Sequence, residues 1–446
     1  MMQMPEPDQQ IMARRDAICA ALRQLVPAAS VVSTAEGRRA YDADGLSAYR
    51  QSPLAVVLPE TVEQIAAVMK YCHAEGIKVV PRGAGTSLSG GALPLADAVL
   101  LGLGKFNRIL DIDYANRCVV AQPGVTNLAI THAVQDQGFY YAPDPSSQIA
   151  CSVGGNVAEN SGGVHCLKYG LTTNNLLGIE LVTIEGEILR LGGKHLDAGD
   201  YDLMGVMTGS EGLLGIVSEV TLRILQKPAT QRALLVGFDD TAAAATAVGD
   251  VIGAGIIPAG MEMMDGLAIN AAEDFVHAGY PRDAAALIIV ELDGPAVEVD
   301  ALIERVAKIM DRAGASSLKV STSEDERNLF WAGRKSAFPA VGRISPDYLC
   351  MDGTIPRRRL PDMMVLMATL SQKYGLRVAN VFHAGDGNLH PLILFDANQP
   401  GELARAEDFG ADILRGCVEM GGVLTGEHGV GVEKRDLMTI QFTEDD

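Results

Sequence analysis

The chain has 446 residues, which is long for a single hydrophobic core, so about two or three domains are expected. Its hydrophobic content of 48% is typical of a globular protein. The formal net charge of -20 at pH 7 argues against binding to nucleic acid and against direct docking on anionic lipid, and it fits a soluble protein.

The first half of the chain predicts a helical lead-in over residues 1–50, followed by a domain over residues 51–227. A strand–helix–strand unit opens this domain, and its helix begins after Thr61 with an apolar stripe at helical spacing. Glycine-rich loops then separate short β-like runs up to a closing strand. The strands are predicted at residues 54–58, 77–80, 99–101, 118–121 and 216–225.

The second half alternates long amphipathic segments with strands over residues 228–400, which predicts an α+β domain whose antiparallel sheet has helices on one face. The predicted strands are residues 232–238, 287–292 and 318–321, and the predicted helices begin at Thr241 or span 296–313 and 362–374. A last segment, residues 401–446, is predicted to be helical over 402–420 and ends beyond a Glu427-His428 pair.

The cysteines and the apolar segments indicate a cytoplasmic protein. The seven cysteines are scattered without a Cys-x-x-Cys pair, so neither a disulfide framework nor an iron–sulfur cluster is expected in this chain. The first residues lack a basic region followed by an apolar stretch, so no signal peptide is expected. Asp250 and Pro258 interrupt the most apolar window, Thr241–Met261, which predicts a buried helix with a loop and not a membrane span.

Two histidines, His383 and His390, flank a predicted hairpin turn at Asp386-Gly387. A type I′ turn centred there would place the histidines directly opposite each other, with Cβ atoms about 4.5–5.5 Å apart. Glu427 is the candidate third ligand. Two imidazoles and a carboxylate suit a divalent metal such as Zn, Mn or Fe with positions left open for substrate. The alternative is a solvated hairpin with incidental histidines.

Four glycine-rich loops in the first domain predict one extended ligand, because glycines let backbone amides approach an anion closely. The loop at residues 81–91 is no Rossmann fingerprint, since Leu88 replaces the third glycine, and no Walker A loop, since Gly91-Ala92 follows Gly90. A dinucleotide lying along these loops is the favoured interpretation, and tight turns in a β-rich domain are the alternative. The candidate contacts are Pro81, Arg82, Gly83, Ala84, Gly85, Thr86, Ser87, Pro143, Asp144, Ser152, Gly154, Gly155, Asn156, Ser161, Gly162, Gly163, Glu211, Gly212 and Ile216.

These loops, together with residues 330–338, 351–358 and 382–394, resemble the FAD-linked 2-hydroxyacid dehydrogenases of the vanillyl-alcohol-oxidase/p-cresol-methylhydroxylase (PCMH) superfamily. The resemblance is above all to the FAD-linked subunits of bacterial glycolate oxidases, and it extends over essentially the whole chain. It implies a two-subdomain PCMH-type FAD-binding domain, a substrate (cap) domain with an antiparallel sheet, and a C-terminal helical segment. The family continues beyond the position of Asp446, so a truncated chain with altered flavin affinity is expected.

The resemblance also implies roles for individual residues. Thr86 stands where covalently flavinylated members have a histidine, so non-covalent FAD is implied. Arg334 resembles the family's substrate-carboxylate arginine, and a surface salt bridge is the alternative. Beside the proposed metal, His428 is the candidate general base because an imidazole titrates near operating pH, and an ordinary loop histidine is the alternative. Asn388 lies in the turn beside the metal ligands.

The reaction implied is oxidation of glycolate to glyoxylate, with hydride transfer to flavin N5. D-Lactate and D-2-hydroxyglutarate are alternative substrates, and the uncharged Cys350 favours a small acid. A non-catalytic flavoprotein subunit and a non-redox metal-binding protein also remain open. The resemblance implies a second flavin-type subunit and an iron–sulfur subunit that pass electrons to quinone, with membrane contact at the inner face only through these partners.

Overall fold

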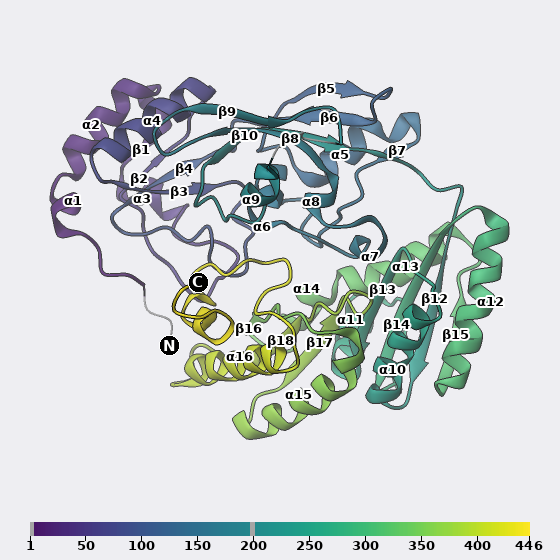
Figure 1. Cartoon of the computed structure of the whole chain (residues 1–446). Coiled ribbons are helices and arrows are strands. Elements are labelled where there is room, and N and C mark those ends of the chain that lie inside the picture. Colours follow the sequence, from purple (N-terminus) through teal and green to yellow (C-terminus); the bar gives the residue numbers. More distant parts are fainter. Residues whose placement is uncertain (1–3, 197–200) are drawn as a thin grey trace.

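The computed structural model describes residues 4–196 and 201–446. Two halves lie against each other, one containing strands β1 to β11 and the other strands β12 to β18 (Figure 1). Among the residues described, none of the helices has the length and apolar character needed to cross a membrane.

The first sheet has the strand order β1-β2-β4-β3, in which β2, β4 and β3 are parallel and β1 is antiparallel to β2. Its strands are β1 (Val31–Val32), β2 (Ala55–Val57), β3 (Lys78–Arg82) and β4 (Ala98–Gly102). Its helices are α1 (Gln9–Ala13), α2 (Arg15–Leu25), α3 (Ala35–Arg39) and α4 (Val62–Ala74). As predicted, Thr61 is the N-cap of α4, and its side chain accepts a hydrogen bond from the Gln64 amide. The lead-in is less helical than predicted, because it contributes β1 to this sheet.

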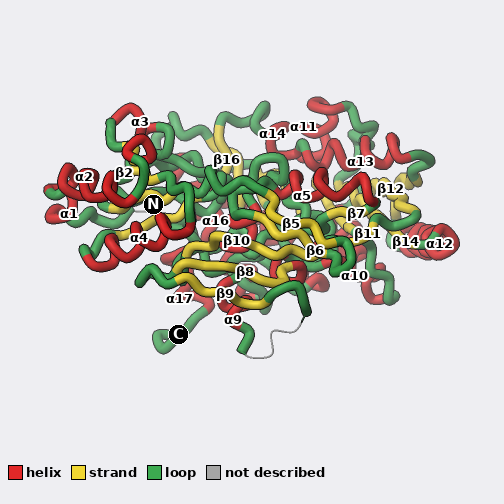
Figure 2. Tube along the Cα trace, turned by 90° about the horizontal axis from the view of Figure 1, so that it is seen from above, coloured by secondary structure: helices red, strands yellow, loops and turns green. Residues whose placement is uncertain are grey.

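The second sheet is antiparallel, with the order β5-β6-β10-β8-β9, and Figure 2 shows it from above. Its strands are β5 (Ile109–Asp113), β6 (Cys118–Ala121), β8 (Leu176–Val182), β9 (Ile188–Gly192) and β10 (Ile216–Arg223). A separate pair joins β7 (Phe139–Tyr140) to β11 (Leu225–Gln226). The helices of this region are α5 (Asn127–Val134), α6 (Val153–Glu159), α7 (Cys166–Tyr169), α8 (Thr172–Asn175) and α9 (Leu203–Met207).

The third sheet has seven antiparallel strands in the order β15-β12-β14-β13-β17-β18-β16. They are β12 (Thr230–Phe238), β13 (Gly260–Asp265), β14 (Ala286–Gly294), β15 (Ala315–Val320), β16 (Asp347–Cys350), β17 (Val378–Phe382) and β18 (Pro391–Phe395). The helices are α10 (Thr241–Gly253), α11 (Gly266–Val276), α12 (Ala296–Arg312), α13 (Glu324–Lys335), α14 (Ala337–Val341), α15 (Leu360–Tyr374), α16 (Glu402–Glu419) and α17 (Met438–Gln441). Short 3-10 helices lie at Ala28–Ser30, Gln135–Gln137, Arg357–Arg359 and Arg435–Leu437.

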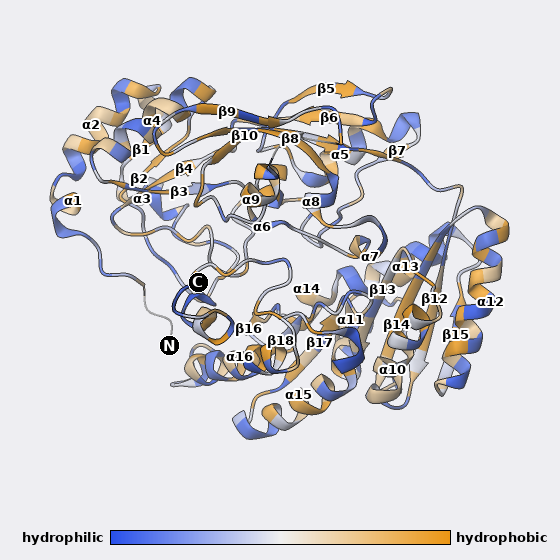
Figure 3. Ribbon diagram, in the orientation of Figure 1, coloured by the Kyte–Doolittle hydropathy of each residue, from blue (hydrophilic) through white to orange (hydrophobic). Residues whose placement is uncertain are grey.

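Helices cover both faces of this sheet, whereas helices on one face were predicted. Leu234 and Val236 pack into a core with α10, α12, α15 and α16, and Ala233 and Leu235 pack into a second core with α11, α13 and α14. The central strand β14 is buried along almost its whole length, so its apolar side chains need cover on both sides. Apolar and polar segments alternate along α12 and α15, as expected for helices with one face on a core (Figure 3).

The apolar window Thr241–Met261 forms α10, a loop and the start of β13. The helix and loop were predicted, but strand β13 was not, because Gly-Met-Glu-Met-Met-Asp lacks the strict alternation of a half-buried strand. β13 lies between β14 and β17, next to the histidine hairpin, so it places Glu262 at the site described below.

Candidate active site

A cavity of about 480 Å³ lies between the two halves. The glycine-rich loops line one side of it. The C-terminal half contributes the remaining wall, through Lys335, Phe338, Pro339, His390, Glu427 and His428. The fold therefore brings the predicted dinucleotide loops and the predicted metal and base residues to one site.

Most of the predicted cofactor residues line this cavity. They are Pro81, Arg82, Gly83, Ala84, Gly85, Thr86, Ser87, Ser152, Gly154, Gly155, Asn156, Ser161, Glu211, Gly212 and Ile216. The loops pack so closely that a Cβ atom on Gly83 would lie 2.2 Å from Ser152 Oγ, and one on Gly212 would lie 2.4 Å from Pro81 Cγ. Gly85 has φ +71°, which favours glycine. This backbone-walled cradle fits an extended dinucleotide such as FAD.

Pro143, Asp144, Gly162 and Gly163 do not line the cavity. The Asp144 carboxylate instead accepts a hydrogen bond at 2.9 Å from His165 Nδ1, and the Pro143 carbonyl accepts one from Asn127. Gly162 lies against the metal-ligand candidate, since a Cβ there would be 2.4 Å from Glu427 Oε2. The side chain of Arg82 is also occupied, because its guanidinium donates to the Tyr41 and Ala92 carbonyls.

The histidine hairpin forms, but its predicted register is wrong by two residues. Asn380 pairs with Pro391, and His383 forms a bridge with Asn388, not with His390. A type I′ turn needs positive φ at both centres, and only Gly387 has it, with φ +87°. A shift of two residues keeps the side chains on the same face, so the His383 and His390 rings still meet, with centroids 4.8 Å apart.

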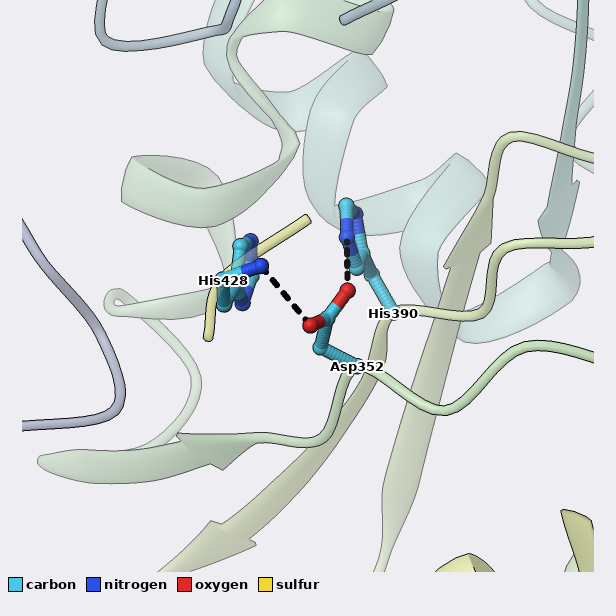
Figure 4. A group of neighbouring side chains, drawn as sticks. All are labelled: Asp352, His390 and His428. Carbon is cyan, nitrogen blue, oxygen red and sulfur yellow. Dashed lines mark hydrogen bonds and ion pairs between the residues drawn. The ribbon is translucent and has the colours of Figure 1, made fainter. Parts of the chain in front are cut away.

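His383, His390 and Glu427 form a compact set of possible metal ligands, with one ligand atom from each lying within 4.8 Å of the others. Glu427 Oε1 lies 3.2 Å from His383 Nε2 and 3.4 Å from His390 Nε2. His390 Nε2 also lies 3.6 Å from Asp352 Oδ1, beyond hydrogen-bonding distance (Figure 4). Burial lowers the His390 pKa to about 4, so the ring is neutral as a ligand must be. Burial opposes ionisation of Glu427, but the charge of His383, whose own pKa is raised well above its ordinary value by Glu262 and Glu427, outweighs it and holds the Glu427 pKa at about 2. This donor set fits Zn, Mn or Fe.

A buried carboxylate supports the first of these ligands. Glu262 Oε1 lies 2.8 Å from His383 Nδ1, which leaves His383 Nε2 directed at Glu427. Such carboxylate–histidine pairs orient metal-bound imidazoles. Glu262 Oε2 in turn forms an ion pair with Arg334 at 2.6 Å, and both side chains are 1% exposed. Arg334 does not line the cavity, so the structure gives this residue a partner other than the predicted substrate carboxylate.

Asp352 contacts His390 and His428 (Figure 4), and it organises the loop that contains Glu427 and His428. Its carboxylate accepts hydrogen bonds from the amides of Gly426, Glu427 and His428 and from the Thr425 hydroxyl, and Lys434 Nζ lies 3.2 Å from it. Both Asp352 and Lys434 are fully buried. The loop geometry is therefore set by one charged acceptor.

His428 is placed to exchange a proton beside the metal-ligand set. Its ring stacks on that of His390, with centroids 4.7 Å apart and planes inclined by 14°. Burial lowers the His428 pKa, so the imidazole is neutral at neutral pH, and its Nδ1 has no hydrogen-bond partner. A neutral imidazole at the cavity wall can accept a proton from a bound hydroxyl.

Sequence reasoning missed four residues at this site: Glu262, Lys335, Asp352 and Lys434. The motif over residues 351–358 includes Asp352, but no role followed from it. Glu262 is an isolated carboxylate between methionines, a pattern that could have drawn attention, because a charged residue in an apolar run needs a partner. Lys335 lies within the motif over residues 330–338, although no role was predicted for it, whereas Lys434 has no comparable signal in the sequence.

Comparison with known proteins identifies the family. A family model described as an FAD binding domain matches residues 53–192, and one described as the C-terminal domain of FAD linked oxidases matches residues 227–446. The chain is 58% identical over 432 residues to glycolate oxidase subunit GlcD of Escherichia coli K12, covering 97% of this chain and 87% of that protein. It is 37% identical over 410 residues to GlcD of Bacillus subtilis, covering 92% and 87%. The chain therefore belongs to the FAD-linked oxidases, and it is an FAD-binding flavoprotein.

Solved structures share the fold at low sequence identity. p-Cresol methylhydroxylase with substrate bound has a TM-score of 0.81 and 18% identity, covering 98% of this chain and 92% of that one. A 4-ethylphenol oxidase from Gulosibacter chungangensis has a TM-score of 0.80 and 19% identity, covering 96% and 91%. The predicted PCMH-type architecture is confirmed.

Proposed function

We propose that the chain is the FAD-linked subunit of a glycolate oxidase and oxidises glycolate to glyoxylate. The observation that supports this best is its 58% identity to the E. coli subunit of that name over 97% of its length. The cavity supports the same function, because the dinucleotide loops, a histidine–carboxylate set and the neutral imidazole of His428 meet there.

In this reaction the chain positions a 2-hydroxy acid and removes one proton. His428 accepts the proton of the substrate hydroxyl, and the loop held by Asp352 keeps this imidazole in place. Bound FAD would accept the hydride from C2 of the acid at N5. We propose that His383, His390 and Glu427 hold a divalent metal, which would lower the pKa of the substrate hydroxyl.

The test of the reaction is a panel of 2-hydroxy acids given to the purified flavoprotein with an artificial electron acceptor. Glycolate should have the highest kcat/KM, ahead of D-lactate and D-2-hydroxyglutarate. Absence of flavin reduction with every acid would indicate a non-catalytic subunit. D-Lactate is the second candidate substrate, because the chain is 30% identical over 395 residues to a D-lactate dehydrogenase of Anaerostipes hadrus.

The metal and the flavin should be separable, because their proposed contacts come from different segments of the chain. A chelator should abolish activity and leave the flavin absorbance of the protein unchanged. Acid precipitation should release the flavin into the supernatant, because Thr86 occupies the cavity wall where a tethering histidine would stand. Full activity of a metal-free His383→Ala/His390→Ala variant would disprove the metal proposal.

We further propose that the subunit works in a cytoplasmic complex. The relatives named as glycolate oxidase subunits support assembly with other chains. The proposed partners are a second flavin-type subunit and an iron–sulfur subunit at the inner face of the plasma membrane. Co-purification of the tagged chain with an iron-containing partner would test this, and purification of a fully quinone-active single chain would contradict it.

A further inference from the structure

Two glutamates of the FAD-binding half, Glu159 and Glu211, face the segment that follows His428. Glu159 is the last residue of α6, and both glutamates line the cavity. A Cβ atom on Gly429 would lie 2.2 Å from Glu159 Oε2 and 2.2 Å from Glu211 Oε1, so the two oxygens are at most twice that distance apart. Gly429 has φ +83° and directly follows the proposed base in the chain. Two carboxyl groups therefore converge on the residue next to His428.

Hydrogen bonds attach this segment to the FAD-binding half. The Gly431 amide donates to Glu211 Oε1 at 2.8 Å, and the Ser89 hydroxyl donates to the His428 carbonyl at 2.8 Å. Glu211 itself has φ +54°, a conformation that a residue with a side chain adopts only where the surrounding structure holds it. The residues on both sides of the convergence point are therefore held from the FAD-binding half, one by the carboxylate of Glu211 and the other by Ser89.

A proton on Glu159 allows the two carboxyl groups to lie this close together. Glu159 Oε2 is buried and has no hydrogen-bond partner among the described residues. Burial and the charge of Glu211 raise the pKa of Glu159 to about 8, so this group is largely protonated at neutral pH. The other charged groups near it are Lys434, Asp44 and Asp352, and the Lys434 ammonium already pairs with Asp352 at 3.2 Å. The pair of glutamates thus has one negative charge and avoids the repulsion between two.

We propose that Glu159 and Glu211 are positioning residues, which share one proton and hold the segment containing His428 against the FAD-binding half. Glu211 accepts the hydrogen bond of the Gly431 amide, and the proton on Glu159 removes the repulsion between the two carboxyl groups. Loss of that proton would leave two adjacent negative charges, which should drive the carboxylates apart and release the Gly431 amide. Asp352 holds the same loop from the other half of the molecule. The proposal rests on the proposed role of His428 as the base.

Hydrogen–deuterium exchange of residues 426–433 in the FAD-loaded full chain tests the positioning without substrate. The wild type is compared with Glu159→Gln, whose side chain has the shape of the protonated acid but cannot lose a proton. At about pH 6.5 the segment should exchange at the same rate in both proteins, because Glu159 is protonated there. At about pH 9.5 it should exchange about tenfold faster in the wild type, because only the wild type has the second negative charge. Equal exchange at both pH values would overturn the proposal.

The pH dependence of flavin reduction tests the link to the reaction. In rapid mixing with saturating glycolate, the wild-type rate should fall above about pH 8, and Glu159→Gln should remove this fall. Glu219→Gln is the matched control, because burial also raises the pKa of Glu219 but this residue does not line the cavity. Glu211→Ala should lower the rate about tenfold with little change in KM, and Glu211→Gln, which keeps an acceptor for the Gly431 amide, should restore most of it.

Two further results would overturn the proposal. One is a fall in rate above about pH 8 that Glu159→Gln leaves unchanged. The other is loss of FAD from this variant, measured by its absorbance, because Glu159 would then act as a contact of the cofactor. If the reaction itself is wrongly assigned, the wild type will not reduce its flavin with glycolate, whereas the difference in hydrogen exchange at about pH 9.5 will persist. The two failures are therefore distinguishable.

Discussion

Asp352 illustrates how one buried charge fixes a loop, here the loop that contains Glu427 and His428. Three consecutive amides and a hydroxyl donate to its carboxylate, and Lys434 neutralises it without any solvent exposure. Hydrogen bonds to a charged acceptor are stronger than neutral ones, so the positions of Glu427 and His428 depend on this single side chain.

Asp352→Asn should therefore impair both stability and catalysis. The substitution leaves the Lys434 ammonium buried without a counter-charge, at a cost of about 3–5 kcal/mol. Thermal or denaturant unfolding should show the loss, and rapid mixing with glycolate should show slower flavin reduction. Asp362→Asn is the control, because its pair with Arg359 is exposed and should contribute little. Equal stability of the two variants would contradict this account.

Among single residues, sequence motifs located the proposed metal ligands and the proposed base, but not the residues that support them. His383, His390, Glu427 and His428 occur in patterns with recognisable spacing. The partners of these side chains depend on which strands become neighbours. Glu262 reaches His383 because β13 pairs with β17, and that pairing is not encoded in any local pattern.

Among the elements, the β17–β18 hairpin determines whether the two histidines meet. Asp386-Gly387 correctly predicted a turn, but the register depends on contacts outside the hairpin. Gly387 lies against the Ile355 carbonyl, which a Cβ atom would approach to 2.2 Å. The Ile355 amide also donates to the Gly387 carbonyl, so the neighbouring segment fixes the turn. Strands with a clear apolar pattern and helices with a capping residue could be predicted from the sequence. The contact between Gly387 and Ile355 could not, because it joins segments that are distant along the chain.

Gly387→Ala should disturb the proposed metal site while FAD stays bound. The positive φ costs an alanine about 1–2 kcal/mol, and the contact with Ile355 adds to it. Gly375→Ala separates the two effects, because Gly375 has φ +64° but a Cβ atom there would meet no other atom within 4 Å. Metal content should fall in Gly387→Ala and stay constant in Gly375→Ala. Equal metal content in both would mean that the turn does not hold the ligands.

Across the whole molecule, an ionic cluster joins the two halves beside the cavity. His165, from the FAD-binding half, lies 2.9 Å from Asp144 and 3.1 Å from Glu291 of the seven-stranded sheet. Glu291 also accepts from Arg327 and from the Trp331 indole. This arrangement keeps the glycine loops and the metal-ligand set in fixed relation, as an active site formed from two domains requires.

The cluster should make stability depend on pH in a defined window. Burial disfavours the charged imidazole of His165, but Asp144 and Glu291 outweigh it and raise its pKa to about 10. The unfolded value is about 6.5, so the stabilisation is complete below about pH 6.5 and is lost as the pH rises through about 10. His165→Gln should cost about 1.5–3 kcal/mol at pH 6 and much less at pH 10. His73→Gln, at an exposed position on α4, is the control. Melting temperatures measured at both pH values would decide the matter: a deficit in His165→Gln that stays constant with pH would mean that the histidine bridges the two halves without its charge.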